Sequence, residues 1–357
     1  MNRLLHSLAD LSLERVPGDD ASLLAMAGFF WITALVVMFR QARGGLLKPA
    51  QSRPLPSGTH VLQFAAGVGA VLLLTEASTR TEKARLPEGW SIIRPPQEVS
   101  ALIVQGATVW AGGRAGLYAV DRVSGATRRH GHFQAVRDLA LDADGALWIA
   151  HAAGVSKLDG APIVDGSAYA VTNTRNGTLW IGTEHGLYSY RTGTLRKVAD
   201  YPVSFVFEDS RGALWFGSDD PSRGGLWRWQ DSRWTAFTNS LVHPSVNGIA
   251  EAADGSMWLA AGFGNGGGLM SYAHGAWSSK TKKDGLPGDK MRSAFRDSRG
   301  AMWFGSEYDG ILTGGKVLTP ADGLAGFEVK EMVEDSDGVL WLGTEAGLSR
   351  IRGRVPR

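Results

Sequence analysis

Carboxylate side chains recur at one position of a pattern that is anchored on tryptophan. The residues four places after seven tryptophans are, in chain order, Arg114, Ala152, Glu184, Asp219, Gly262, Glu307 and Glu345. Four of these seven are acidic, so they would form an anionic rim if the fold gathered them in one place. Such a rim favours a basic partner segment or a cation. The alternative interpretation is that these are ordinary solvated loop residues.

Two neighbouring copies of the pattern carry insertions directly after the tryptophan. The next apolar strand residue follows the tryptophan by seven places in four copies and by eight in the sixth, but by eleven after Trp215 and Trp258. The inserted stretches, 218–225 and 261–268, contain Asp219, Asp220, Arg223, Phe263 and Asn265. Insertions on a rigid scaffold are common positions for binding sites. We therefore take these five residues and the three rim glutamates as candidates for binding a ligand or partner, with drift in a permissive loop as the alternative.

No arrangement of reactive side chains predicts catalysis. The eight histidines are scattered, only His130 and His132 lie close together, and no metal-ligand spacing emerges. The pairs Asp142/Asp144 and Asp335/Asp337 have the spacing of part of a calcium loop, but the rest of such a loop is missing, so they are interpreted as turn residues. The absence of cysteine excludes disulfides, thiolate metal sites and cysteine nucleophiles. We expect a non-catalytic protein with no cofactor and no bound metal.

The tryptophans belong to a repeat that runs through residues 89–351. Successive copies are 38, 32, 35, 43, 45 and 38 residues apart, within or near the range of one four-stranded propeller blade. A turn that ends in glycine precedes six of the tryptophans, and a small residue follows soon after each. The tryptophans are Trp110, Trp148, Trp180, Trp215, Trp258, Trp303 and Trp341, and the turn aspartates include Asp142, Asp209, Asp297 and Asp335.

Each part of the repeat has a structural reason. An aspartate side chain accepts backbone N–H groups within the turn, and glycine adopts the positive φ that a tight hairpin needs. A short strand with an aromatic residue suits a buried position between blades, and the small residues after the tryptophan are expected to let the backbone crowd near the axis. We therefore predict an all-β seven-bladed β-propeller. Its last copy has only three strands, so we expect residues 89–94 to supply the fourth and close the ring.

At these residues the chain resembles a known family. The pattern D-x-x-G-x-L-W-[IFL]-G-[TS]-x-x-G-L is similar to the two-component regulator propeller repeat over nearly all of residues 89–351. The resemblance implies a relationship to the sensor halves of bacterial hybrid two-component systems, whose propellers bind extracytoplasmic ligands, often oligosaccharides. Only the basic tail 352–357 follows the last repeat, without a kinase, receiver or DNA-binding domain. Signalling activity is therefore not expected of this chain by resemblance alone.

The segment before the repeats predicts a membrane hairpin. Residues 21–39 carry no charge over a length of about 29 Å, close to the thickness of the hydrocarbon core. Residues 54–75 form a second uncharged run, although it includes His60 and Gln63. We expect a leader over 1–20 that is an interfacial helix or a solvated tail, two spanning helices, a connecting loop over 40–53 and a linker over 76–88. A signal peptide followed by a buried helix is the alternative for this region.

Positive charges favour one orientation of this hairpin. The connecting loop holds Arg40, Arg43, Lys48 and Arg53 and no acidic residue, which favours the cytoplasmic side. The propeller would then lie on the periplasmic or extracytoplasmic side of a bacterial cytoplasmic membrane. The net charge of +2 and the lack of a long basic run argue against nucleic-acid binding.

Two functions follow from this organisation. The first is a sensory or regulatory module that binds a small molecule, a glycan or a protein and acts through a separate membrane protein partner. The second is an accessory subunit of a larger membrane complex, with the helices docked in the membrane and the propeller capping the complex.

Overall fold

A computed structural model describes residues 86–218, 220, 224–264 and 266–353. The chain divides into two units, Met1–Thr81 and Glu82–Arg357, and the structure is informative for the second. The leader 1–20, the helices expected at 21–39 and 54–75 and the loop 40–53 lie outside the described residues, as does most of the tail 352–357. In the part of the chain that the structure does describe, no helix is both long and apolar enough to cross a membrane.

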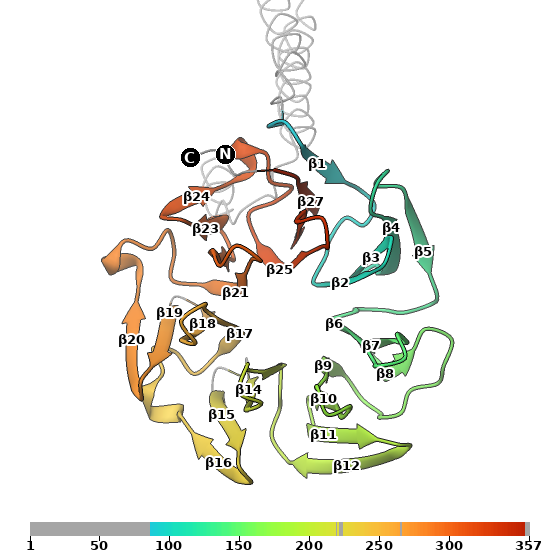
Figure 1. Cartoon of the computed structure of the whole chain (residues 1–357), viewed down its shortest axis with the longest axis vertical. Coiled ribbons are helices and arrows are strands. Elements are labelled where there is room, and N and C mark those ends of the chain that lie inside the picture. Colours follow the sequence, from blue (N-terminus) through green and yellow to red (C-terminus); the bar gives the residue numbers. More distant parts are fainter. Residues whose placement is uncertain (1–85, 219, 221–223, 265, 354–357) are drawn as a thin grey trace, which may run out of the picture. The chain divides into compact units, whose positions relative to one another are not determined.

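Seven antiparallel sheets surround a common axis, so the predicted all-β seven-bladed propeller is confirmed (Figure 1). Blade 1 consists of β2 (Ala101–Gln105), β3 (Thr108–Gly113), β4 (Gly116–Asp121) and β5 (Thr127–His130). Blade 2 consists of β6 (Asp138–Leu141), β7 (Leu147–His151) and β8 (Gly154–Lys157), and blade 3 of β9 (Ala168–Asn173), β10 (Leu179–Thr183), β11 (Gly186–Arg191) and β12 (Thr194–Ala199). Blade 4 consists of β13 (Phe205–Glu208), β14 (Leu214–Ser218), β15 (Gly225–Gln230) and β16 (Arg233–Ala236).

The second half of the ring follows the same order. Blade 5 consists of β17 (Val246–Glu251), β18 (Met257–Phe263), β19 (Gly266–Ala273) and β20 (Ala276–Lys280), and blade 6 of β21 (Met291–Arg296), β22 (Met302–Ser306), β23 (Ile311–Thr313) and β24 (Lys316–Leu318). Blade 7 consists of β25 (Val329–Glu334), β26 (Leu340–Thr344), β27 (Gly347–Ile351) and β1 (Trp90–Ile93). Short 3-10 helices, η1 (Thr238–Ser240), η2 (Lys282–Asp284) and η3 (Pro320–Asp322), lie in the segments that join blades 4 to 5, 5 to 6 and 6 to 7.

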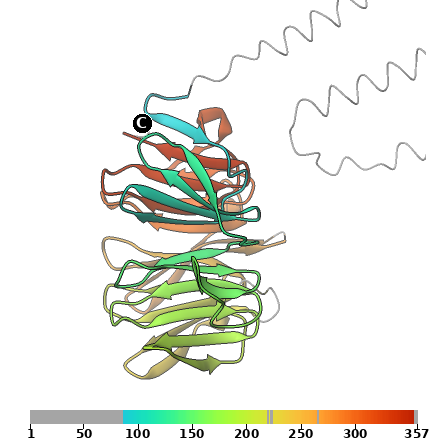
Figure 2. The ribbon, with the colours of Figure 1, turned by 90° about the vertical axis from the view of Figure 1, so that its right-hand side faces the viewer.

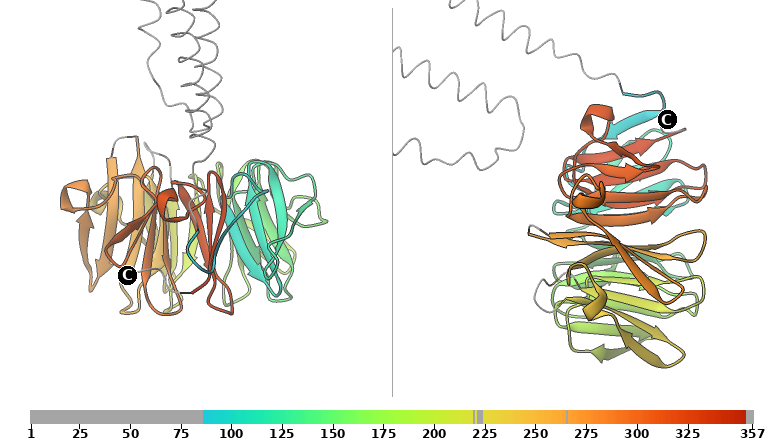
Figure 3. Two further views of the ribbon diagram at one scale, coloured as in Figure 1. Left: turned by 90° about the horizontal axis from the view of Figure 1, so that it is seen from above. Right: turned by 90° about the vertical axis from the view of Figure 1, so that its left-hand side faces the viewer.

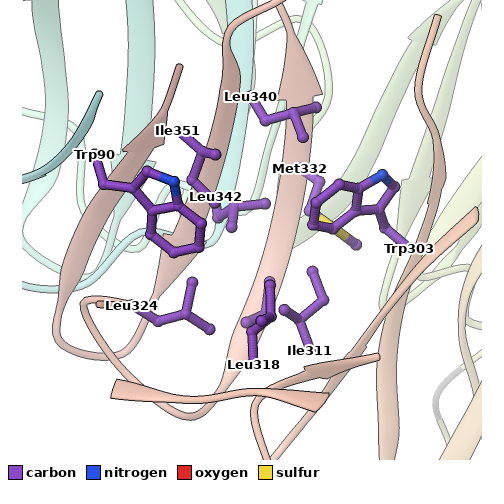
Figure 4. Close-up of a cluster of buried hydrophobic side chains, with 10 residues drawn as sticks. Trp90, Trp303, Ile311, Leu318, Leu324, Met332, Leu340, Leu342 and Ile351 are labelled. Carbon is purple, nitrogen blue, oxygen red and sulfur yellow. The ribbon is translucent and has the colours of Figure 1, made fainter. Parts of the chain in front are cut away.

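The N-terminal strand closes the ring, as the sequence predicts. β1 pairs antiparallel with β27, with Trp90 opposite Ile351 and Ile93 opposite Leu348. Trp90 is only 7% exposed and belongs to the buried cluster between blades 6 and 7, together with Trp303, Leu324 and Ile351 (Figure 4). Residues that are far apart in the chain therefore form one blade and one core.

Blade 2 departs from the four-stranded plan. Its sheet contains only β6, β7 and β8 among the described residues, and residues 158–167 occupy the outer side. Ile163 N donates to Val155 O at 2.8 Å, but no ladder forms. Pro162 has no N–H to donate and Gly160 adds no side chain to pack, which explains the loss of the strand. The shortest spacing between repeats, from Trp148 to Trp180, falls on this blade.

The turn aspartates and the tryptophans are linked directly. The indole Nε1 of the tryptophan donates to the Oδ2 of the aspartate six places earlier, at 2.9–3.1 Å, in four blades. These pairs are Trp148–Asp142, Trp215–Asp209, Trp303–Asp297 and Trp341–Asp335. The other carboxylate oxygen accepts N–H groups of the turn, as in Asp335 with Val339 N at 3.0 Å. Trp258 instead donates to Ser256 Oγ at 3.2 Å.

The small residues after the tryptophans pack between blades and do not crowd the axis, so that prediction was wrong. A Cβ added at Gly112 would lie 2.3 Å from Val136 of the next blade, and one at Gly343 would lie 2.7 Å from Val99. The space beside each small residue is filled by a residue at or just before the start of an inner strand. These residues are all 0% exposed: Val99, Val136, Ala168, Val203, Val246, Met291 and Val329. At Gly182, Gly305 and Gly343 an added Cβ would also lie 2.3–2.8 Å from a backbone carbonyl oxygen of the next blade, which leaves no room for a side chain.

Candidate functional site

The loops on one face of the ring carry most of the predicted binding residues. These loops connect the second to the third strand within a blade, or one blade to the next, and we call this the mouth face. Figure 2 shows the ring edge-on, with the strands of each blade running between its two faces. The β18–β19 hairpin of blade 5 extends beyond the neighbouring loops (Figure 3). The blade 5 insertion has therefore lengthened a hairpin and has not produced an irregular loop.

The rim glutamates hold the loops that join the blades. Glu345 accepts Phe327 N with Oε1 and Glu328 N with Oε2, both at 2.9 Å. Glu184 accepts Ser167 N at 3.0 Å. Glu98, which the sequence does not single out, accepts Arg114 N at 2.6 Å. Two of the four predicted rim acids, Glu184 and Glu345, thus bind the protein's own backbone.

Glu307 has a different partner and the most informative surroundings. Its Oε2 lies 2.9 Å from the Nζ of Lys290, which also lies 4.9 Å from the ring centre of Tyr308 and 6.0 Å from that of Phe263. Burial alone would raise the pKa of Glu307, but hydrogen bonds from Tyr308 and Lys290 lower it below its ordinary value. Burial would lower the pKa of Lys290, but its hydrogen bonds with Glu307 and Tyr308 raise it above its ordinary value. The pair is therefore fully ionised at neutral pH.

Two exposed aromatic side chains lie beside this ion pair, and a third lies on the adjoining loop. Phe263 is 56% exposed, Tyr308 50% and Phe327 46%. Phe327 lies on the adjoining loop, where its carbonyl accepts Gly310 N at 3.0 Å. We call Phe263, Lys290, Glu307, Tyr308 and Phe327 the blade 5–7 surface. It joins cation, carboxylate and aromatic groups on adjacent loops of the mouth face.

The remaining predicted residues belong to the two insertions. Asp219, Arg223 and Asn265 lie outside the described residues. Asp220 is described, and its backbone N donates to Ser218 Oγ at 3.3 Å. The structure thus brings Phe263 and Glu307 together, whereas Glu184 and Glu345 serve other loops.

A cavity of about 490 Å³ occupies the axis of the ring. Its wall comes from the inner strands of all seven blades, β2, β6, β9, β13, β17, β21 and β25. Four of these strands have an irregular register near the mouth. The ladder register skips Tyr169, Asn247, Arg292 and Lys330, which all line the cavity. Bulges of this kind redirect side chains, and here they give the cavity a polar mouth.

Two carboxylates lie in the cavity wall, Asp138 of blade 2 and Glu331 of blade 7. Asp138 accepts Leu139 N and Val171 N, each at 2.8 Å, and Glu331 Oε1 accepts Met332 N at 2.9 Å. Burial raises the pKa of Asp138 to about 7. Burial, with a smaller contribution from the charge of Asp138, raises the pKa of Glu331 to about 8.

Sequence reasoning missed Lys290, Tyr308, Phe327, Asp138 and Glu331. The repeat pattern could have identified Asp138 and Glu331. Both occur four residues before a turn aspartate, a position that holds Ala101, Ala170, Phe205, Gly248 and Ser293 in the other blades. An ionisable residue at a position that is otherwise uncharged marks a functional candidate.

The described residues contain no cluster of three or more metal-ligating side chains. The one buried histidine with a hydroxyl partner, His151, lies 3.0 Å from Ser156 Oγ, and Ser156 is 1% exposed. Its Nδ1 accepts Ala153 N at 3.3 Å, as a turn residue would. This pair is closed to a substrate and stabilises the hairpin.

The model of one family, described as two component regulator propeller, matches residues 328–346. This stretch contains β26 with Trp341 and its turn aspartate. One repeat of the propeller, in blade 7, therefore matches the model of this family. A search of curated proteins finds no match.

Solved structures share the propeller fold of this chain at low sequence identity. The extracellular domain of a putative hybrid two component system from B. thetaiotaomicron is 19% identical, with a TM-score of 0.63 over 74% of this chain. A second such domain from the same organism is 17% identical, with a TM-score of 0.62 over 76% of the chain. The chain spans only 41% and 40% of those structures.

An enzyme shares the architecture as well. Virginiamycin B lyase from Staphylococcus aureus is 16% identical, with a TM-score of 0.57 over 73% of this chain and 97% of the lyase. The fold alone therefore does not decide between binding and catalysis.

Proposed function

We propose that this propeller is a non-catalytic binding module of a sensory or regulatory kind. The observation that carries the proposal is the blade 5–7 surface, where the exposed rings of Phe263 and Tyr308 lie beside the Lys290–Glu307 pair and Phe327 is exposed on the adjoining loop. Aromatic residues are enriched where proteins bind partners, and clustered exposed apolar groups mark interaction sites. The two extracellular domains of putative hybrid two component systems support the same class of function.

The proposal includes a membrane anchor and an extracytoplasmic propeller. It rests on the uncharged runs 21–39 and 54–75 and on the basic loop between them. Because the chain has no cysteine, the reaction of a single introduced cysteine shows on which side of the membrane that residue lies. Val123→Cys, at a position that is 74% exposed, should react with a membrane-impermeant maleimide in intact spheroplasts. Arg43→Cys should react only after lysis, and the reverse pattern would overturn the orientation.

The binding function is tested by purification of the full chain in mild detergent. A variant with Phe263→Ser, Tyr308→Ser and Phe327→Ser should lose a partner or ligand that the native chain retains. A matched control changes Val123, Trp234 and Val317 to serine, because these residues are 74%, 42% and 38% exposed elsewhere on the propeller. Equal recovery of every bound component with both variants would rule out the blade 5–7 surface as the contact site.

The protruding β18–β19 hairpin favours a second candidate, an accessory subunit of a membrane complex (Figure 3). A hairpin that extends beyond its face suits contact with another protein better than enclosure of a small molecule. A subunit should co-purify with other membrane proteins in fixed stoichiometry. A sensor should instead show a thermal shift with a soluble small molecule or glycan.

A further inference from the structure

The central cavity contains charged groups that the protein itself does not neutralise. Three cationic side chains line it: Arg137, Arg292 and Lys330. Arg292 pairs with Glu328 at 3.1 Å, and Lys330 pairs with Glu98 at 2.9 Å and with Glu328 at 3.3 Å. Arg137 has no carboxylate partner within 4.0 Å among the described residues. Its guanidinium is held in place by neutral groups only.

The position of Arg137 is fixed by blade 3. Its Nη1 donates to Ser167 Oγ at 2.6 Å and to Ala168 O at 3.2 Å, and the guanidinium lies 4.7 Å from the ring centre of Tyr169. These contacts leave the Nε and Nη2 donors without a partner in the described part of the chain. Neither nitrogen is fully buried, so both are accessible to solvent or to a ligand. The guanidinium of Arg137 is thus held in a fixed orientation and keeps two nitrogen donors available for a ligand.

The two carboxylates of the cavity, in turn, have no cationic partner among the described residues. Asp138 and Glu331 accept only backbone N–H groups, and neither pairs with a cation in the ranges that the structure describes. The second oxygen of Glu331, Oε2, accepts no hydrogen bond there and is not among the buried unpaired atoms. The two acids lie on either side of blade 1, whose residue at this register position is Ala101. Space for a cationic group therefore adjoins both acids.

Strand β9 sets the spacing between the opposite charges. Arg137 is anchored at Ala168 O and Asp138 at Val171 N, which are two peptide units apart along β9. Two residues of a strand span about 7 Å. In an α-amino acid the ammonium nitrogen and the carboxylate oxygens are about 3 Å apart. With a hydrogen bond of about 2.8 Å at each end, such a head group bridges this separation.

Part of the cavity wall is apolar. Ile103, Phe205, Phe207 and Ile249 line it along with the charged and polar groups. Its volume of about 490 Å³ is within the range of small-molecule sites. Burial disfavours the charged forms of Asp138 and Glu331 and raises their pKa values, and a bound ammonium would offset this cost.

We propose that the central cavity binds a small zwitterion with an apolar body, of the α-amino acid type, with its carboxylate on Arg137 and its ammonium between Asp138 and Glu331. This inference deepens the proposed binding function and rests on it. It assigns the ligand to the axis of the ring, apart from the blade 5–7 surface.

Calorimetry and thermal shift on the full chain in mild detergent test the assignment. The probe is L-leucine, compared with 3-methylbutylamine, which lacks the carboxylate, and 4-methylpentanoate, which lacks the ammonium. L-Leucine should bind and raise the melting temperature, and each analogue should bind at least about tenfold more weakly, because one buried charge is left unpaired. Absence of L-leucine binding at millimolar concentration, or equal binding of the analogues, would overturn the proposal.

Variants identify the site. Arg137→Gln and Glu331→Gln should each weaken L-leucine binding at least about tenfold. Arg196→Gln and Glu88→Gln change the same residue types at exposed positions and should leave it unchanged. If Arg137→Gln fails to fold, Arg137→Lys keeps the charge but loses the fork geometry, and native affinity in that variant would contradict the assignment. Loss of L-leucine binding with partner recovery intact separates this site from the blade 5–7 surface, and unchanged binding in all these variants would refute it.

Discussion

Asp335 accepts a hydrogen bond from the indole nitrogen of Trp341 at 3.0 Å, six residues further along the chain. Trp341 is 0% exposed and Asp335 6%, so the bond satisfies a donor that water cannot reach. The same relationship holds in three other blades. In blade 1, Gln105 Oε1 takes the indole N–H of Trp110 at 2.7 Å. In blade 3, where Thr174 replaces the aspartate, the indole nitrogen of Trp180 has no hydrogen-bond partner among the residues that the structure describes.

Asp335→Ala should destabilise the propeller by about 3 kcal/mol. The change removes the acceptor for Trp341 Nε1, Asp337 N and Val339 N, and unsatisfied buried donors cost about 1–3 kcal/mol. Thermal unfolding followed by tryptophan fluorescence measures the effect. Asp144→Ala, at an exposed turn position, is the control and should change stability by less than about 0.5 kcal/mol. Equal effects of the two substitutions would contradict the structural role of the bond.

Thr174→Asp should stabilise blade 3 by about 1 kcal/mol, the net contribution of one hydrogen bond. The new carboxylate would take the place that Asp209 has in blade 4, where it accepts Trp215 Nε1 at 2.9 Å and Ala213 N at 2.9 Å. Thr174→Val keeps the shape without an acceptor, and both substitutions lose the bond from Thr174 Oγ1 to Thr178 O, so only the valine variant should destabilise. If the aspartate variant were no more stable than the valine variant, Trp180 would not need an acceptor.

Trp90→Ala should cost about 3–5 kcal/mol, as expected for loss of a buried aromatic side chain. Trp90 lies in the strand that closes the ring and is 7% exposed. The control is Trp234→Ala, at a residue that is 42% exposed, and its effect on the melting temperature should be smaller. Deletion of residues 87–96 should lower the melting temperature sharply. An unchanged melting curve after this deletion would refute the closure of the ring by β1.

Much of the fold could be predicted from the sequence because blade geometry depends on local patterns. The turn aspartates, the glycines and the tryptophans recur at nearly fixed spacing, and the missing fourth strand after Ile351 leads back to Trp90. The three-stranded blade 2 was not predicted, because the repeat aligns on Trp148 and carries no information about the outer edge. The bond between Asp335 and Trp341 was also missed, since a spacing of six residues matches no hairpin rule.

The candidate site could be predicted less well. Glu345 has the expected position at the rim, but its two oxygens bind Phe327 N and Glu328 N, a role that depends on how blades pack. Lys290 lies in a loop between blades, so its contact with Tyr308 depends on tertiary structure. The cavity acids Asp138 and Glu331 come from blades that are far apart in sequence, and only ring closure brings them near each other.

Glu331→Gln should stabilise the propeller more at pH 9 than at pH 5. Burial raises the pKa of Glu331 from the ordinary 4.5 to about 8, so between these values the folded state binds more protons than the unfolded state. Stability of the native chain therefore falls as pH rises through this window, and glutamine removes that loss. The difference in melting temperature between variant and native chain should grow from pH 5 to pH 9. The exposed Glu88→Gln should show no such trend, and a constant difference for Glu331→Gln would contradict the assigned pKa.

Site-specific photocrosslinking in cells tests the binding function most directly. A photoreactive phenylalanine at Phe263, at Tyr308 or at Phe327 should capture a discrete partner or ligand, because these exposed side chains form the blade 5–7 surface. The same residue at Trp234 or Val123, which are also exposed, should capture none. Adducts at the three mouth-face positions alone are the predicted result. Absence of adducts there, or the same adducts at all five positions, would contradict the account.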